Sequence, residues 1–143
     1  MATPQTFQNH AHRPTATIIG FAFTGVALGA FGARFLRGDH SPVMVGLLAI
    51  TGALLALLYI SRVYTVKLQD RIIRLEMRVR GAALLTAEQQ RILHGLTIKK
   101  VVALRFASDA ELPLLLERAG REQLSPSDIK RAVTTWTPDQ DRT

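Results

Sequence analysis

Two long stretches without a charged residue constrain this chain more than any other feature. Residues 15–33 and 41–61, which are 19 and 21 residues long, contain no Asp, Glu, Lys or Arg. A helix rises 1.5 Å per residue, so each stretch reaches about 30 Å, the thickness of the hydrocarbon core of a bilayer. A cleaved signal peptide would have a shorter apolar core, and no second stretch would follow it so soon. The sequence therefore predicts two membrane spans, at about residues 15–36 and 42–61.

The residues between the two stretches predict a hairpin. The connection reads Gly38-Asp39-His40-Ser41-Pro42. Gly commonly follows the end of a helix, Ser caps the start of the next one, and Pro suits its first position. So short a connection makes the two spans antiparallel neighbours, and residues 15–61 are predicted to form a transmembrane hairpin.

Small residues recur along one face of each span. Close approach through small residues is how helices associate in lipid, although small residues are also common there without such a role. We interpret the two sets as a helix-packing seam that joins the two spans of one chain, because positions 32 and 46, 29 and 49, 25 and 53, and 22 and 56 all centre on residue 39. The seam residues are Ala22, Gly25, Gly29, Gly32, Gly46, Ala49, Ala53 and Ala56.

After the second span, residues 62–80 predict a basic amphipathic stalk. They contain no Gly or Pro, so the span and the stalk are expected to form one helix that ends near Gly81. Apolar residues at helical spacing are predicted to bind a partner, namely Leu68, Ile72, Leu75 and Val79. Basic residues beside them are predicted to meet anionic lipid headgroups, or only to set the topology, namely Arg62, Lys67, Arg71, Arg74, Arg78 and Arg80.

The distribution of charge predicts the orientation and argues against a nucleic-acid partner. The connection carries two Arg residues, whereas six Lys and Arg residues follow the second span, so both termini should be cytoplasmic. The net charge is +7, and residues 1–80 hold nine basic against three acidic residues, a net +6. The excess charge lies beside the spans, where membrane lipids are the expected partner.

The rest of the chain predicts a small helical domain at residues 81–136, between a polar lead at 1–14 and a flexible tail at 137–143. Start signals for helices occur at Thr86, Thr97, Ser108 and Ser125. Pro113 would lie inside the third of these helices and should distort it. The predicted core consists of Ile92, Leu93, Leu96, Val101, Val102, Leu104, Leu115, Leu116, Leu124, Ile129 and Val133.

No reaction chemistry is indicated. The chain has no Cys, its four His residues form no ligand pattern, and it contains no phosphate loop, nucleophile elbow or dinucleotide motif. No charge lies in the middle of either span, which argues against an ion path. We therefore expect no catalytic residue, no metal, no cofactor and no small-molecule substrate.

Three segments carry a resemblance to a known family. They are Phe7-Gln-Asn-His10, residues 68–78 (LQDRIIRLEMR) and residues 103–113 (ALRFASDAELP). In these segments the chain resembles an uncharacterised bacterial family of small two-span membrane proteins, a domain of unknown function. The resemblance implies a bacterial cytoplasmic membrane and supplies no catalytic residues.

The expected fold is thus an all-α membrane protein: a two-helix transmembrane hairpin, a second helix extended as a stalk, and a small cytoplasmic helical domain. The expected function is that of a non-catalytic structural or interaction protein, either an accessory subunit of a larger membrane complex or a homo-oligomer. The alternative is a membrane-anchored regulatory module that relays a signal through the stalk.

Overall fold

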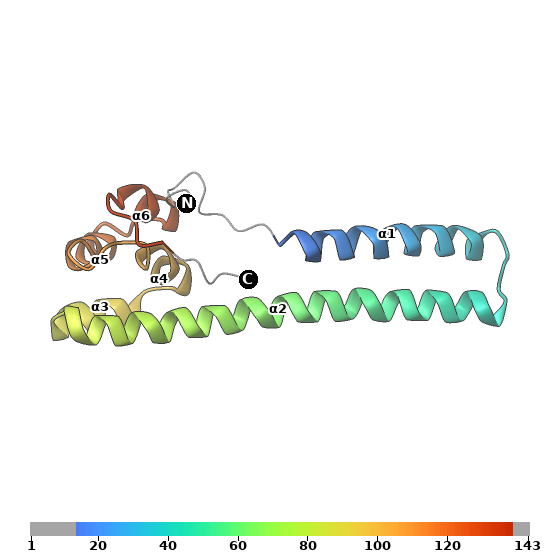
Figure 1. Cartoon of the computed structure of the whole chain (residues 1–143), viewed down its shortest axis with the longest axis horizontal. Coiled ribbons are helices and arrows are strands. Elements are labelled where there is room, and N and C mark those ends of the chain that lie inside the picture. The colour runs from blue at the N-terminus through green and yellow to red at the C-terminus, as the bar shows by residue number, and fades with distance from the viewer. Residues whose placement is uncertain (1–13, 139–143) are drawn as a thin grey trace. The chain divides into compact units, whose positions relative to one another are not determined.

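The computed structural model describes residues 14–138 and is all-helical in that range, which confirms the predicted class of secondary structure (Figure 1). The described residues form no strand, and their only β-type pairing is an isolated bridge between Ala107 and Trp136. The six helices are α1 (Thr15–Leu36), α2 (Pro42–Leu84), α3 (Ala87–Gly95), α4 (Ile98–Leu104), α5 (Leu112–Arg121) and α6 (Pro126–Ala132).

Contacts divide the described chain into two compact units, one up to Lys67 and one from Leu68 onward. Helix α2 runs without a break from Pro42 to Leu84, so the predicted continuity of the second span and the stalk is confirmed. Helices α1 and α2 are each long and apolar enough to cross a membrane.

In the first unit, α1 and the part of α2 up to Lys67 run antiparallel through the predicted turn (Figure 1). Gly38 has a φ of +101°, a conformation that favours glycine, and the Ser41 Oγ accepts a hydrogen bond from the backbone N–H of Met44 at 3.3 Å. Asp39 accepts hydrogen bonds from Ser41 and from Arg34, and these hold the pKa of its carboxyl below the ordinary value of 3.8. The predicted roles of the Gly, Ser and Pro residues are confirmed.

The structure does not place the predicted small-residue seam between α1 and α2. A Cβ atom added to any of the four glycines would meet nothing within 4 Å, and the four alanines are exposed. The prediction that these residues face one another within the chain is wrong, whereas their packing against another chain stays a prediction. The residues concerned are Ala22, Gly25, Gly29, Gly32, Gly46, Ala49, Ala53 and Ala56.

A different face of each helix is turned inward. Thr51 of α2 is only 4 % exposed, and Thr24 of α1 is partly buried. Each hydroxyl donates a 2.7 Å hydrogen bond to the carbonyl oxygen four residues earlier in its own helix: Thr24 to Gly20, and Thr51 to Leu47. Such an internal partner is what a hydroxyl group would need in lipid. The small residues do share one face of each helix, but that face is not the one turned toward the other helix.

The closest approach recorded for a glycine in this hairpin lies at Gly20. A Cβ atom there would stand 3.3 Å from Cδ2 of Leu58 and 3.5 Å from its Cδ1, so Gly20 faces α2. Phe21 of α1 and Leu47 of α2 are also partly buried. Larger side chains therefore fill the space between the helices, while most of the small ones lie outside it.

This arrangement predicts different responses to the same substitution at two positions in α1. Gly20→Leu should overpack the face against Leu58 and cost about 1–3 kcal/mol. Gly29→Leu adds the same side chain where nothing lies within 4 Å and should leave the stability unchanged. Thermal unfolding of the two full-length variants in detergent measures the difference, and a larger loss for Gly29→Leu would restore the small-residue seam.

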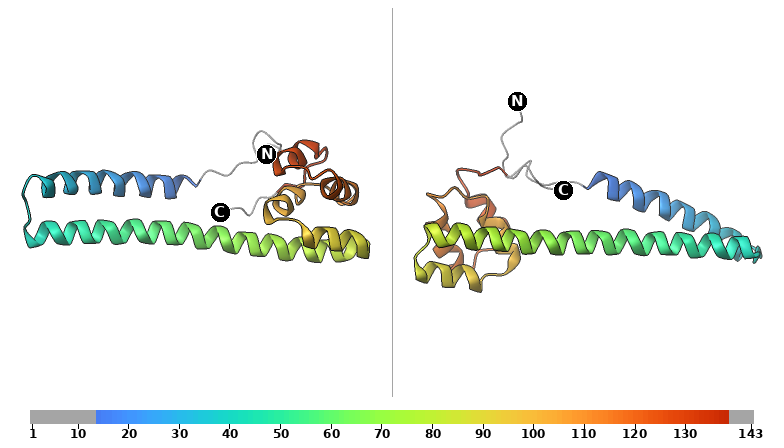
Figure 2. Two further views of the ribbon diagram at one scale, coloured as in Figure 1. Left: turned by 180° about the vertical axis from the view of Figure 1, so that it is seen from behind. Right: turned by 60° about the horizontal axis from the view of Figure 1, so that its bottom comes forward.

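In the second unit, helices α3 to α6 pack on the last turns of α2 (Figure 2). Seven predicted core residues are buried, and the remaining four (Ile92, Leu96, Val102 and Leu124) pack against the core while partly buried. The prediction omitted Phe106 and Leu112, which are fully buried, and also Ile73 and Met77, by which α2 enters the core. The buried residues that were predicted are Leu93, Val101, Leu104, Leu115, Leu116, Ile129 and Val133.

The predicted helix starts are largely confirmed. Thr86 and Gln89 form a reciprocal capping box at α3, and the Ser125 Oγ accepts a hydrogen bond from the backbone N–H of Asp128 at α6. Thr97 occupies the N-cap position of α4 without a side-chain hydrogen bond.

Two predicted boundaries are wrong. Helix α5 begins at Leu112 rather than near Ser108, so Pro113 lies in its first turn, where proline causes no distortion. Helix α2 continues through Gly81 to Leu84. A Cβ atom at Gly81 would lie 3.2 Å from Cδ2 of Leu93, so this glycine allows α3 to approach α2 closely.

The chain after α6 is held against the second unit. Thr134 donates hydrogen bonds from its backbone N–H and its Oγ1 to the Glu111 carboxylate, both at 2.8 Å, and the N–H of Thr137 donates to the carbonyl of Phe106. Burial raises the pKa of Glu111, but the hydrogen bonds from Thr134 and Thr135 outweigh it and the pKa lies below its ordinary value of 4.5. The predicted tail thus began too early; residues 139–143 and residues 1–13 of the predicted lead lie outside the described residues.

Candidate functional site

The last turns of α2, from Leu68 to Ala82, have two opposite faces with different surroundings. Ile73 and Met77 are 7 % and 2 % exposed and belong to the core of the second unit. Since successive residues in a helix are 100° apart, the predicted partner-binding residues lie about 150° round the helix from this buried pair. We call the buried side the inner face and the opposite side the outer face.

Arg80 fixes the inner face to the rest of the unit. Its Nε donates to the Asp109 Oδ1 at 2.7 Å, its Nη2 to the carbonyl of Ala107 at 2.6 Å and its Nη1 to the carbonyl of Arg105 at 3.1 Å. A planar guanidinium can reach three acceptors in this way because its donors diverge in one plane. The side chain is 21 % exposed, so the expectation that Arg80 meets lipid headgroups is wrong.

The outer face is apolar and uncovered within the described residues. Leu68, Ile72, Leu75 and Val79 are 56, 55, 63 and 66 % exposed. They are the four residues that the sequence predicted as a partner-binding stripe, and the structure brings them together on one side of one helix. Large apolar side chains grouped in this way are typical of a protein or membrane contact.

Charged residues lie along the two edges of the outer face. Arg71 and Arg78 are exposed at one edge and Glu76 is exposed at the other. Within residues 14–138 these three side chains form no ion pair; the conceivable partner of Glu76 on its own helix, Arg80, is bound to Asp109 instead. The outer face is thus an apolar strip with a basic edge and an acidic edge.

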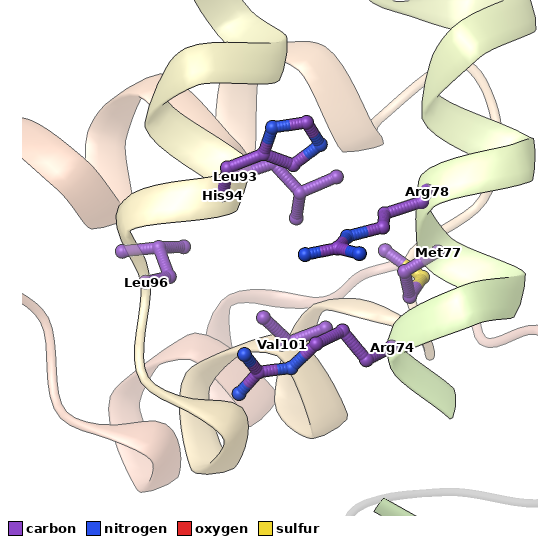
Figure 3. Close-up of a pocket in the computed structure, with 7 residues that line it drawn as sticks. All are labelled: Arg74, Met77, Arg78, Leu93, His94, Leu96 and Val101. Carbon is purple, nitrogen blue, oxygen red and sulfur yellow. The ribbon is translucent and has the colours of Figure 1, made fainter. Parts of the chain in front are cut away.

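Two of the basic residues also line a small hollow between α2 and α3. In Figure 3 the guanidinium groups of Arg74 and Arg78 reach into it, with the imidazole of His94 on its far side and Met77 and Val101 in its wall. The hollow has a volume of about 10 Å³, enough for a single water but not for a metabolite. Its cations can contact an anion at the opening only.

The remaining basic residues of the stalk belong to the first unit. Lys67 is exposed and its Nζ lies 5.9 Å from the centre of the Tyr64 ring, a cation–π contact, while Arg62 is partly buried. Among residues 14–138 no three His, Asp or Glu side chains come together as a metal site.

Comparison with known proteins places the chain in one family. The model of a family of unknown function, DUF6526, matches residues 1–143, and the chain belongs to that family. Searches of the curated proteins and of the solved structures found no match.

The geometry of Arg80 predicts that lysine cannot replace it. Arg80→Lys keeps the charge but offers donors from one nitrogen only, which cannot serve Asp109, Ala107 and Arg105 together. The free energy of unfolding should fall by about 1–3 kcal/mol. Arg71→Lys is the control because Arg71 is exposed and forms no ion pair within the described chain. Thermal unfolding of both variants checks this. Equal midpoints would show that the three hydrogen bonds of Arg80 do not stabilise the unit.

Proposed function

We propose that the chain is a non-catalytic membrane protein whose two-helix hairpin anchors a small helical domain, and whose α2 outer face binds another protein. The observation that carries the proposal is the grouping of Leu68, Ile72, Leu75 and Val79 on the outer face, each more than half exposed. The protein serves as an accessory subunit of a larger membrane complex or as a homo-oligomer.

The lengths and the composition of α1 and α2 support the membrane anchor. Residues 15–36 and 42–61 act as the spans, and their outward side chains are apolar, as a hydrocarbon solvent requires. The inward position of Thr24 and Thr51 supports the same environment, since their hydroxyls need not face lipid. The resemblance to bacterial two-span proteins favours the bacterial cytoplasmic membrane.

The basic residues after the second span support the orientation, with both termini in the cytoplasm. Lys67 and Arg71 are exposed near the expected membrane surface, where positive charge both retains a segment in the cytoplasm and attracts anionic headgroups. Arg34 in the opposite connection forms a 2.8 Å ion pair with Asp39, which offsets part of its positive charge.

The energetics of the outer face support a protein partner. Burying a large aliphatic side chain contributes about 1.5–3 kcal/mol, and this face offers four of them on a preformed helix. Large aliphatic side chains grouped on one exposed helix face are typical of an interaction site, so protein binding explains this surface. A regulatory module that relays a signal through the stalk is the alternative, and it would need two stable arrangements of the second unit.

The proposed orientation predicts the labelling of single cysteines, which can be placed freely because the chain has none of its own. His40→Cys in the turn should react with a membrane-impermeant maleimide on intact spheroplasts. Ser127→Cys, at an exposed position in α6, should react only after lysis. Labelling in the reverse order would overturn the orientation, and labelling of both before lysis would argue against insertion.

The proposed partner contact predicts a loss of assembly when the outer face is made polar. Leu75→Glu should release the partner because it places a charge in the centre of the apolar strip. Leu114→Glu is the matched control: Leu114 is 74 % exposed in α5, outside this face, and should keep the assembly. Chemical crosslinking of the full-length protein in membranes, followed by mass determination, measures the assembly. A wild-type monomer, or a Leu75→Glu variant that assembles normally, would contradict the proposal.

A further inference from the structure

The outer face carries the residue pattern of a two-stranded coiled coil. Leu68, Ile72, Leu75, Val79 and Ala82 follow one another at spacings of four, three, four and three, which is the a/d pattern of a heptad repeat. The a positions hold the β-branched Ile72 and Val79, and the first two d positions hold Leu68 and Leu75. β-Branched residues at a with Leu at d favour a parallel dimer.

The charged edges of the outer face complement a second copy of themselves. In this heptad, Arg71 occupies a g position and Glu76 the e position five residues later. In a parallel, in-register pair the g residue of one helix lies beside that e residue of the other, so Arg71 meets Glu76 of the second helix, twice by symmetry. An antiparallel pair would bring g beside g and e beside e, placing arginine beside arginine and glutamate beside glutamate. The charges therefore select the parallel arrangement.

The packing of the inner face against the second unit leaves the outer face of α2 open. Ile73 and Met77 are buried in the second unit, and Arg80 holds α2 to the carbonyls of Arg105 and Ala107. These contacts set the rotation of the helix, so that the a/d residues point away from the unit to which they belong. A second helix can approach without displacing α3 to α6.

We propose that the outer face of α2 binds the same face of a second copy of the chain, forming a parallel, in-register coiled coil from Leu68 to Ala82. The inference rests on the proposed membrane anchor, because two copies inserted in the same orientation present their stalks in parallel. This coiled coil covers about two heptads, which is too short to hold an isolated dimer together in dilute solution. Confinement in one membrane supplies the high effective concentration that a short coiled coil needs.

The experiment measures self-association of the full-length chain in membranes through one cysteine. Leu75→Cys places a thiol at a d position, close to its equivalent in the partner, and mild oxidation should give a disulfide-linked dimer. The control, Leu114→Cys, places a thiol at a still more exposed position outside the outer face and should give none.

Charge exchange in the Leu75→Cys background tests the register. Arg71→Glu alone or Glu76→Arg alone turns both cross-pairs repulsive and should lower the initial rate of disulfide formation about tenfold, the effect of two weak surface pairs that reverse sign. Co-expression of the two variants with different tags should restore the rate in the mixed dimer only. The double variant Arg71→Glu/Glu76→Arg should restore the rate in a dimer of two identical chains.

Each result separates the inference from the proposed function. Dimers whose rate does not recover on charge exchange would overturn the parallel, in-register pairing. Absence of the Leu75→Cys disulfide would overturn self-association while leaving the proposed function intact, provided that Leu75→Glu still releases a different protein. Absence of both the disulfide and any released partner would overturn both proposals.

Discussion

The guanidinium of Arg80 determines which side of α2 belongs to the helical domain. A helix can pack on a globular unit through any face that is apolar enough, and between Leu68 and Ala82 this one has two such faces. The three hydrogen bonds from Arg80 to Asp109, Ala107 and Arg105 fix the choice, since they can form only when Ile73 and Met77 point into the core. Because those acceptors lie in the segment between α4 and α5, the same contacts also order the connection that precedes α5.

The apolar strip on the other side is a consequence of that choice. A soluble helix of this length would ordinarily carry polar residues opposite its buried face, as the period of amphipathic helices requires. Here Leu68, Ile72, Leu75 and Val79 occupy that position, and the chain bears the cost of exposing them. Their spacing, and the opposite charges of Arg71 and Glu76 at the edges, are the features that a random exposed surface would lack.

Local signals in the sequence predicted the hairpin turn, the continuous second helix and most helix starts, because a cap or a turn depends on a few neighbouring residues. They also located most of the core, although Phe106 lies beyond the last helical residue of α4 and gave no periodic signal. Prediction was weakest where one helix offers two regular faces. The small residues around Gly29 and the larger ones around Thr51 both repeat at helical spacing, and nothing local says which of them faces inward. On the stalk the sequence predicted the exposed stripe but not the buried pair Ile73 and Met77. Two apolar residues in successive turns are too few to form a recognisable repeat.

The unbroken path of α2 through Gly81 also limits how this part of the protein can change during evolution. Exchanging a side chain between Leu68 and Arg80 alters only the contacts of that residue, but inserting a single residue there would rotate everything beyond it by about 100° and shift it by about 1.5 Å. The inner and outer faces would then no longer match across the insertion. Changes of about seven residues restore the phase, because two turns of the helix return nearly to the same direction. The length of this segment is thus under stronger constraint than the identity of most of its residues.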